Sequence, residues 1–225
     1  MNKHAHRLSQ SGHTPRELRI IAGQWRGRRW RFPAGPDIRP TPDRVRETLF
    51  NWLAPHIRGA RVLDLFAGSG ALGLEALSRG AAHATFVDTD PRAVDALCKR
   101  CTEWSSASRE AGTPVGSAEF HRADSLAFLA VPAGRASPGP FAMPFDVVFL
   151  DPPFGAGLWG KVASRLESGG WLTPQAFVYL EAPSGELPPG LPPTLQSWRH
   201  GTAGEVGYHL LRRDARPSSD EVPPA

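Results

Sequence analysis

The chain has few of the features that mark secreted, metal-binding or membrane proteins. Its only cysteines are Cys98 and Cys101. They are one helical turn apart with no second Cys or His pair nearby, so we expect ordinary helix residues and no disulfide, metal or redox site. No apolar run approaches the roughly 20 residues that span a bilayer, and residues 1–7 lack the apolar core of a signal peptide. The sequence therefore predicts a cytoplasmic protein without a metal.

Lysine is scarce too, and the positive charge is unevenly distributed. Of 26 basic residues only 3 are Lys, and residues 1–61 hold 13 Lys and Arg against 4 Asp and Glu. A basic segment ahead of a near-neutral body indicates a polyanionic partner. A GC-rich genome would also favour Arg over Lys, but it would not cluster the charge. The length of 225 residues fits one large α/β domain, with or without a small appendage.

The most informative stretch runs from Asp146 to Phe154, DVVFLDPPF. Its apolar part predicts a buried parallel strand, and two consecutive prolines, Pro152 and Pro153, must end that strand because neither has an N–H. The Asp151 carboxylate, a free carbonyl and the Phe154 ring then lie together. The carboxylate and the carbonyl can each accept one hydrogen of an exocyclic amine on a nucleobase, while the Phe154 ring stacks on that base.

The alternative for this stretch is that Asp-Pro-Pro only ends a strand in a turn. The apolar strand before it and the aromatic residue after it favour a functional role. We therefore expect Asp151, Pro152, Pro153 and Phe154 to form a catalytic site for a substrate amine.

Composition and periodicity divide the chain into four parts. Residues 1–17 are polar without periodicity and predict a disordered tail, and residues 214–225 predict a loose C-terminal tail. Residues 18–58 predict a basic hairpin followed by a helix. Residues 59–213 alternate between strand and helix patterns, which indicates a parallel sheet covered by helices. Residues 131–144 are rich in Pro, Gly and Ala and predict a surface loop.

The hairpin is predicted as two short strands around a turn at residues 24–27. Arginine forks suit phosphate groups, and exposed Trp25 and Trp30 could stack on unpaired bases; alternatively both rings pack inward. The helix is predicted with Thr41 as N-cap and an end near Ala54. The basic residues that we expect to bind RNA are Arg19, Arg26, Arg28, Arg29, Arg39 and Arg44.

A second motif, DLFAGSGALG, follows the first predicted strand of the main domain, residues 62–66. Gly68 and Gly70 fit a dinucleotide fingerprint, with Asp88 near the expected ribose position. Asp64 argues against NAD, because a carboxylate there repels a pyrophosphate and attracts a cation. The α-ammonium group of S-adenosylmethionine is such a cation.

This interpretation gives the remaining acidic residues roles as well. The Asp88 carboxylate can accept from both ribose hydroxyls, and Asp124 can accept from the adenine amine. The alternatives are an ordinary tight turn for the glycines and helix capping for Asp88 and Asp124, with Ser125 as a competing cap. We expect cofactor binding by Asp64, Phe66, Gly68, Gly70, Asp88 and Asp124.

Topology should bring the two motifs together. In a doubly wound sheet the strand order reverses beside the first strand, and ligands bind at the carboxyl ends of the strands at that point. The segment from Asp64 to Gly70 would then face the segment from Asp151 to Phe154. A methyl donor and an amine acceptor would meet in one crevice.

At this point the sequence resembles the RsmD-type bacterial methyltransferases, over residues 18–213. The resemblance rests on RIIAGQWRG at residues 19–27, RPTPDRVRETLFNWL at 39–53, DLFAGSGALGLEA at 64–76 and DPPF at 151–154. The first two blocks are the more specific ones. The segments at residues 105–117 and 131–144 look like longer loops than the family usually has.

The resemblance implies a Rossmann-like class I fold with a seven-stranded, mostly parallel sheet, and S-adenosyl-L-methionine as methyl donor. It implies methylation of the exocyclic N2 of guanine 966 in 16S rRNA, within the 30S subunit or a late assembly intermediate. We expect a monomer. The alternatives are an adenine-N6 DNA methyltransferase, an NAD-dependent oxidoreductase and a non-catalytic RNA-binding factor.

Overall fold

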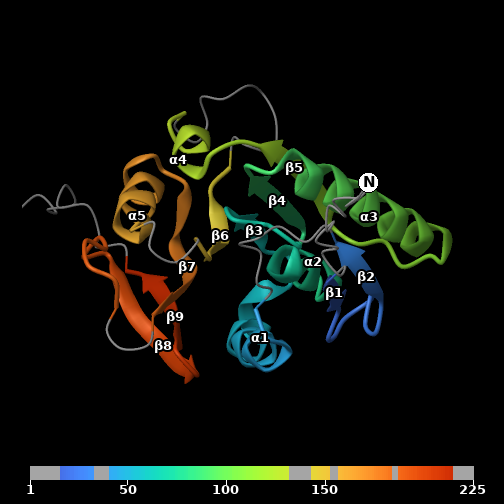
Figure 1. The fold of residues 1–225 in the computed structure, drawn as a ribbon, viewed down its shortest axis with the longest axis horizontal. Coiled ribbons are helices and arrows are strands. Elements are labelled where there is room, and N and C mark those ends of the chain that lie inside the picture. Colours follow the sequence, from blue (N-terminus) through green and yellow to red (C-terminus); the bar gives the residue numbers. More distant parts are fainter. Residues whose placement is uncertain (1–15, 33–40, 132–142, 153–156, 184–186, 215–225) are drawn as a thin grey trace, which may run out of the picture.

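The computed structural model describes residues 16–32, 41–131, 143–152, 157–183 and 187–214. Figure 1 shows its helices and strands, with the N-terminal hairpin in blue and the C-terminal strands in red. In chain order they are β1 (Arg16–Arg19), β2 (Arg29–Phe32), α1 (Asp43–Ile57), β3 (Arg61–Asp64), α2 (Ala71–Ser78), β4 (His83–Asp88), α3 (Pro91–Glu110), β5 (Ser117–Arg122), α4 (Ser125–Phe128), β6 (Phe145–Leu150), α5 (Trp159–Ser168), β7 (Leu172–Pro183), β8 (Leu195–Ala203) and β9 (Val206–Arg213). Within these ranges no helix is long and apolar enough to cross a membrane.

A seven-stranded sheet forms the centre of the molecule. Its order is β5-β4-β3-β6-β7-β9-β8. The strands from β5 to β7 are parallel, and β9 and β8 close the sheet antiparallel. This confirms the predicted fold class. β3 lies between β4 and β6, so the strand order reverses there, as predicted.

Helices cover both faces of this sheet, which gives three layers (Figure 1). On one face, α1, α2, α3 and the hairpin share a hydrophobic core that includes Trp25, Leu49, Leu74, Leu97 and Phe149. On the other face, α4 and α5 pack over a second core. The hairpin and α1 therefore fold on the same core as the sheet.

The tryptophans of the hairpin face inward. Trp25 is fully buried, its Nε1 donates to Ser108 Oγ at 2.9 Å, and its ring meets that of Trp104 edge-on at 5.4 Å. Trp30 is also buried. The predicted exposure of these rings is wrong and the inward alternative is right, because α3 supplies an apolar surface that local sequence does not show. The predicted turn at residues 24–27 is present.

A buried ion network fastens the hairpin to α2. Glu75 is fully buried, and its carboxylate accepts from the backbone N–H of Ile21 at 2.8 Å and of Ala22 at 3.0 Å. Arg79 Nε donates to the same carboxylate at 2.8 Å, and Arg46 of α1 lies 3.7 Å from it. The carboxylate thus joins the hairpin to two helices.

Two helices differ from their predicted bounds. The N-cap of α1 is Pro42, so the predicted capping role of Thr41 is wrong, and Thr41 is buried. The helix continues beyond Ala54 to Ile57, because Ile57 is buried in the core. The helix α3 extends to Glu110, so residues 105–110 are helical, where a loop was expected.

Candidate active site

Asp64 is the last residue of β3, at the carboxyl edge of the sheet. Its side chain is 4% exposed, and it accepts from the Gly73 N–H at 3.0 Å. The pKa of Asp64 is raised to about 7: burial is the main cause and the negative charge of Asp88 adds to it, while hydrogen bonds from the backbone of Gly73 and Phe66 oppose the shift. Phe66, two residues on, is half-buried. A buried carboxyl group with a second acid nearby suits a positively charged ligand group.

The glycines after β3 hold a close turn against α3 and β4. Gly70 caps α2 with φ of +75°, and a Cβ at this position would lie 2.4 Å from a Leu97 methyl group. A Cβ at Gly73 would lie 2.1 Å from the Phe86 ring. The third glycine of the motif thus serves close packing of helix against strand. Gly68 also has a positive φ, of +49°.

Asp88 ends β4 and joins that turn to the next loop. Its carboxylate accepts from the Gly68 N–H at 2.7 Å and from the Asp90 N–H at 2.8 Å. Each oxygen has a further lone pair to offer a ligand. Gly68, Gly70 and Asp88 therefore lie together beside Asp64, as the sequence predicted for one site.

Asp124 is exposed and caps the short helix α4. Its Oδ1 accepts from the N–H groups of Leu126 at 2.9 Å and Ala127 at 3.0 Å. Asp124, and not Ser125, is the N-cap. Asp124 follows β5, the strand next to β4, at the same edge of the sheet as Asp88.

Asp151 directly follows β6, the other neighbour of β3. Burial, together with the charges of Glu181 and Asp64, raises the pKa of Asp151 well above its ordinary value. Pro152 is buried and lies outside the strand, as predicted. Pro153, Phe154 and Arg39 lie outside the described residues. The structure thus brings the DLFAGSGALG motif together with Asp151 and Pro152, the first half of the DPPF motif.

Sequence reasoning missed a third carboxyl group at this edge. Glu181 of β7 is buried, and its Oε1 accepts from the Tyr179 hydroxyl at 2.8 Å. Burial raises the pKa of Glu181, and hydrogen bonds from Thr41 and Tyr179 oppose the shift. Leu180 pairs with Leu150, so Glu181 stands level with Asp151. The signal available in the sequence was one acidic residue at the end of an apolar strand.

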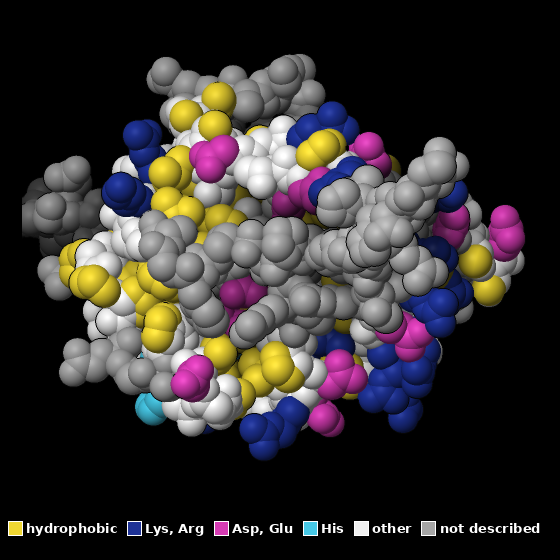
Figure 2. Space-filling model, viewed as in Figure 1, with side chains coloured by type: hydrophobic (Ala, Val, Ile, Leu, Met, Phe, Trp, Pro, Cys, Tyr) yellow, Lys and Arg dark blue, Asp and Glu magenta, His cyan; other side chains and the backbone are white. Residues whose placement is uncertain are grey.

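The edge therefore carries Asp64, Asp151 and Glu181 on three consecutive strands. Figure 2 shows acidic side chains deep in the middle of this face of the molecule. Two of these carboxyl groups are buried and Asp151 is half-buried, so the three cannot all ionise at neutral pH without compensation. The site favours a cationic ligand and hydrogen-bond donors, and it disfavours a phosphate.

The predicted RNA-binding arginines differ in their surroundings. Arg19 pairs with Asp43 at 3.4 Å, and Arg29 pairs with Glu17 at 2.7 Å. Arg28 is half-buried with its guanidinium 5.7 Å from the centre of the Trp104 ring. Arg26 and Arg44 are exposed, and neither forms an ion pair with another described residue. No acid among the described residues therefore competes with a ligand for these two arginines.

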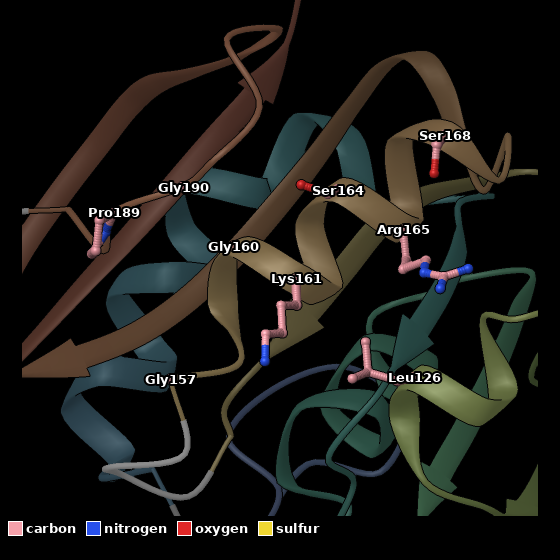
Figure 3. A pocket seen from close by; sticks show the side chains of 9 residues that line it. All are labelled: Leu126, Gly157, Gly160, Lys161, Ser164, Arg165, Ser168, Pro189 and Gly190. Carbon is pink, nitrogen blue, oxygen red and sulfur yellow. The ribbon is translucent and has the colours of Figure 1, made fainter.

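An open groove of about 610 Å³ lies on the other flank, along α5. Figure 3 shows Lys161 and Arg165 projecting from α5 toward the side on which Leu126 of α4 lies, with Gly160 packed beside Gly190. Gly157, which also lines the groove, comes three residues after the DPPF motif. No acidic side chain lines the groove among the residues described, so its charge is positive.

Comparison with known proteins gives consistent matches over most of the chain. A family model described as conserved hypothetical protein 95 matches residues 18–212. Ribosomal RNA small subunit methyltransferase D of Escherichia coli K12 is 44% identical over 207 residues, which cover 91% of this chain and 94% of that protein. The Haemophilus influenzae protein of the same name is 40% identical over 196 residues, 87% of this chain and 94% of that protein. The solved structure of a putative methyltransferase from Escherichia coli has a TM-score of 0.73 and 42% identity, and covers 89% of this chain and 99% of that one.

Proposed function

The chain belongs to the conserved hypothetical protein 95 family, with the ribosomal RNA small subunit methyltransferases D as its relatives, and we propose that it methylates 16S rRNA. The methyl group passes from S-adenosyl-L-methionine to the exocyclic N2 of a guanine, at position 966 by the family resemblance. The single observation that carries this proposal is the meeting of Asp64 and Asp151 at the carboxyl ends of adjacent parallel strands. Asp64 suits a cationic methyl donor, and Asp151 suits the amine that receives the methyl group.

The residues at the donor side fit S-adenosyl-L-methionine. Asp64 would hold the α-ammonium group, because a buried carboxyl with a raised pKa gains most from a neighbouring cation. Asp88 would accept from the ribose hydroxyls and Asp124 from the adenine amine, with Phe66, Gly68 and Gly70 at the edges of the site. When bound, the cofactor supplies an electrophilic methyl group on a sulfonium that leaves as a neutral thioether.

The residues at the acceptor side prepare the guanine amine. Its N2 lone pair is delocalised into the ring, so the site must hold the nitrogen pyramidal and in line with the methyl group. The Asp151 carboxylate and the Pro152 carbonyl would accept the two amine hydrogens, and Phe154, which follows Pro153 in the motif, would stack on a base flipped from its loop. As the N–C bond forms, N2 becomes cationic and Asp151 takes its proton. The raised pKa of Asp151 makes it a stronger base for this step.

The basic N-terminal segment supplies the RNA contacts of this proposal. Arg26 and Arg44 bind backbone phosphates directly. Arg19 and Arg29 must first break their ion pairs with carboxylates before they can bind a phosphate. Arg28 and Arg39 complete the predicted set. The substrate is the 30S subunit or a late assembly intermediate, the protein acts as a monomer, and it works in the cytoplasm.

Transfer of radiolabelled methyl groups to defined acceptors tests the proposal. Purified protein is given unmodified 30S subunits, naked 16S rRNA or duplex DNA, and the products are digested to nucleosides. We expect N2-methylguanosine from 30S subunits. N6-methyladenine from DNA would instead assign the site to an adenine methyltransferase. If no methyl group were transferred to any of the three acceptors, the protein would instead be interpreted as a non-catalytic RNA-binding factor.

A further inference from the structure

Glu181 stands beside the proposed acceptor residue. In the parallel pair of β6 and β7, Phe149 is opposite Tyr179 and Leu150 is opposite Leu180, so Asp151 and Glu181 follow at the same level. Paired residues of neighbouring strands point to the same face of a sheet. The rings of Phe149 and Tyr179 accordingly meet at 6.2 Å. The two carboxyl groups therefore project side by side at the edge where the substrate amine is held.

The Glu181 side chain is held in place from two sides. The Tyr179 hydroxyl donates to its Oε1 at 2.8 Å, and the Thr41 hydroxyl, just before α1, donates a second hydrogen bond. Trp159 Nε1 donates to the Glu181 carbonyl at 2.8 Å and fixes the backbone. A carboxylate offers about four lone-pair positions, so these two side-chain bonds leave acceptor capacity on an oriented group.

The Glu181 carboxyl group is buried next to a second acid. It is 6% exposed, and no ion pair joins it to a cation in the part of the chain that the structure describes. Its charge instead raises the pKa of the neighbouring Asp151. A buried acid that is oriented, uncompensated and next to a second acid points to a ligand that brings hydrogen-bond donors.

We infer that Glu181 accepts the N1–H of the target guanine and so selects guanine over adenine. Guanine carries N1–H beside its N2 amine, so one edge of the base offers adjacent donors to Glu181 and Asp151. Adenine carries an unprotonated N1 beside its amine, which would place a lone pair against the Glu181 carboxylate. The adenine N1 and the remaining acceptor position of Glu181 would then both be left without a donor. The inference rests on the proposed function and names the residue that sets its base specificity.

A base analogue separates this role from a structural one. 2-Aminopurine keeps the 2-amino group of guanine but has no hydrogen on N1. We would reconstitute 30S subunits with either base at the target position and measure kcat/KM for each. Wild-type protein should prefer guanine by about 100-fold or more, as sites built to hydrogen-bond a group reject analogues that lack it.

The variant Glu181→Gln should lower that preference to less than about 10-fold, because an amide can accept from N1–H or donate to N1. Glu181→Asp has a shorter side chain, which moves the carboxylate away from the base, so it should lower the preference for guanine as well. This variant replaces the first if Glu181→Gln does not fold. Glu110→Gln, at the exposed C-terminal end of α3, is the matched control: it makes the same chemical change on the surface and should keep the preference. Donor binding should be unchanged in all three.

Two results would overturn the inference. If Glu181→Gln lowered kcat/KM equally on guanine and on 2-aminopurine, the preference for guanine would be intact. Glu181 would then be a structural residue only. Wild-type protein that methylates guanine but does not discriminate against 2-aminopurine would show that N1–H is not read. A wild-type protein inactive on the guanine substrate would instead overturn the proposed function itself, and this inference with it.

Discussion

Asp64 and Asp151 end two adjacent parallel strands, and the negative charge of Asp64 contributes to the raised pKa of Asp151. The residues are 87 positions apart in the chain, yet the reversal of strand order beside β3 makes them neighbours. Because Asp64 is buried and Asp151 is half-buried, a charge brought to Asp64 affects the protonation of Asp151. In the proposed mechanism the bound donor would therefore affect the basicity of Asp151.

Donor binding should depend on pH through Asp64. Its pKa in the free protein is raised to about 7, so near pH 7 the group is partly protonated. A bound ammonium group favours the ionised form, so affinity should rise as pH increases toward 7 and level off above it. Calorimetry at pH 7 in buffers of different ionisation enthalpy should show release of about half a proton from this group.

The variant Asp64→Asn is the control for this pH dependence. It keeps an oxygen for the Gly73 N–H but cannot ionise. We expect weaker donor binding at every pH, by about 10-fold to 100-fold, and no rise in affinity between pH 6 and 8. A wild-type pH profile in this variant would remove Asp64 from contact with the donor.

Asp151→Ala should abolish methyl transfer with little change in donor binding. The substitution removes both the acceptor for the amine hydrogens and the base for the departing proton, and we expect a rate loss of about 10³-fold or more. Equilibrium binding of the donor checks that the site is still formed. Normal turnover by this variant would exclude Asp151 from the mechanism.

Replacing Arg26 and Arg44 with Ala should flatten the salt dependence of RNA binding. Both are exposed and free of ion pairs with the described residues, so each should bind a phosphate. The slope of log affinity against log salt should fall by about 0.7 to 0.9 for each phosphate that the variant no longer neutralises. Filter binding to 30S subunits over a range of salt concentrations measures it.

Lys99→Ala with Arg109→Ala is the matched control, because it removes two exposed charges from α3 and leaves the hairpin intact. This pair should change the slope by much less than the first pair. Equal effects of the two pairs would mean that net charge, and not a docking surface, determines the affinity.

Glu75→Ala should destabilise the protein by about 3–5 kcal/mol, because it leaves Arg79 without its acid, the fully buried Arg46 with Asp43 alone, and two N–H groups of the hairpin without an acceptor. Unfolding in urea measures the change. Glu110→Ala, on the exposed end of α3, should change stability by less than about 0.5 kcal/mol. A small effect of Glu75→Ala would show that the hairpin packs without this network.

Local patterns predicted the frame of the fold and the two motifs that meet at the carboxyl edge of the sheet. The apolar strand before Asp151 and the alternation of strand and helix patterns determine the parallel sheet, and the topology then brings Asp64 and Asp151 together. Asp90, directly before Pro91, caps α3 and accepts from the Arg92 N–H at 2.9 Å, which is a typical start of a helix. These features depend on short stretches of sequence.

The errors concern interactions between residues far apart in the chain. Thr41 has the sequence of a helix cap, but its hydroxyl bonds to Glu181, 140 positions away. Trp25 looked available for stacking on RNA, but Ser108 and Trp104 of α3 bury it. Neither partner is visible from the local pattern. The same is true of Glu181, whose importance depends on the register between β6 and β7.

Methylation of 16S rRNA inside a cell tests the proposed activity most directly. A bacterial strain that lacks its own methyltransferase D would express this chain or its Asp151→Ala variant, and fragments of the 16S rRNA would be analysed by mass spectrometry. We expect N2-methylguanosine at position 966 with the wild-type chain and an unmodified guanine with the variant. A methyl group on another nucleotide, or no methylation by a folded protein that binds the donor, would contradict the proposal.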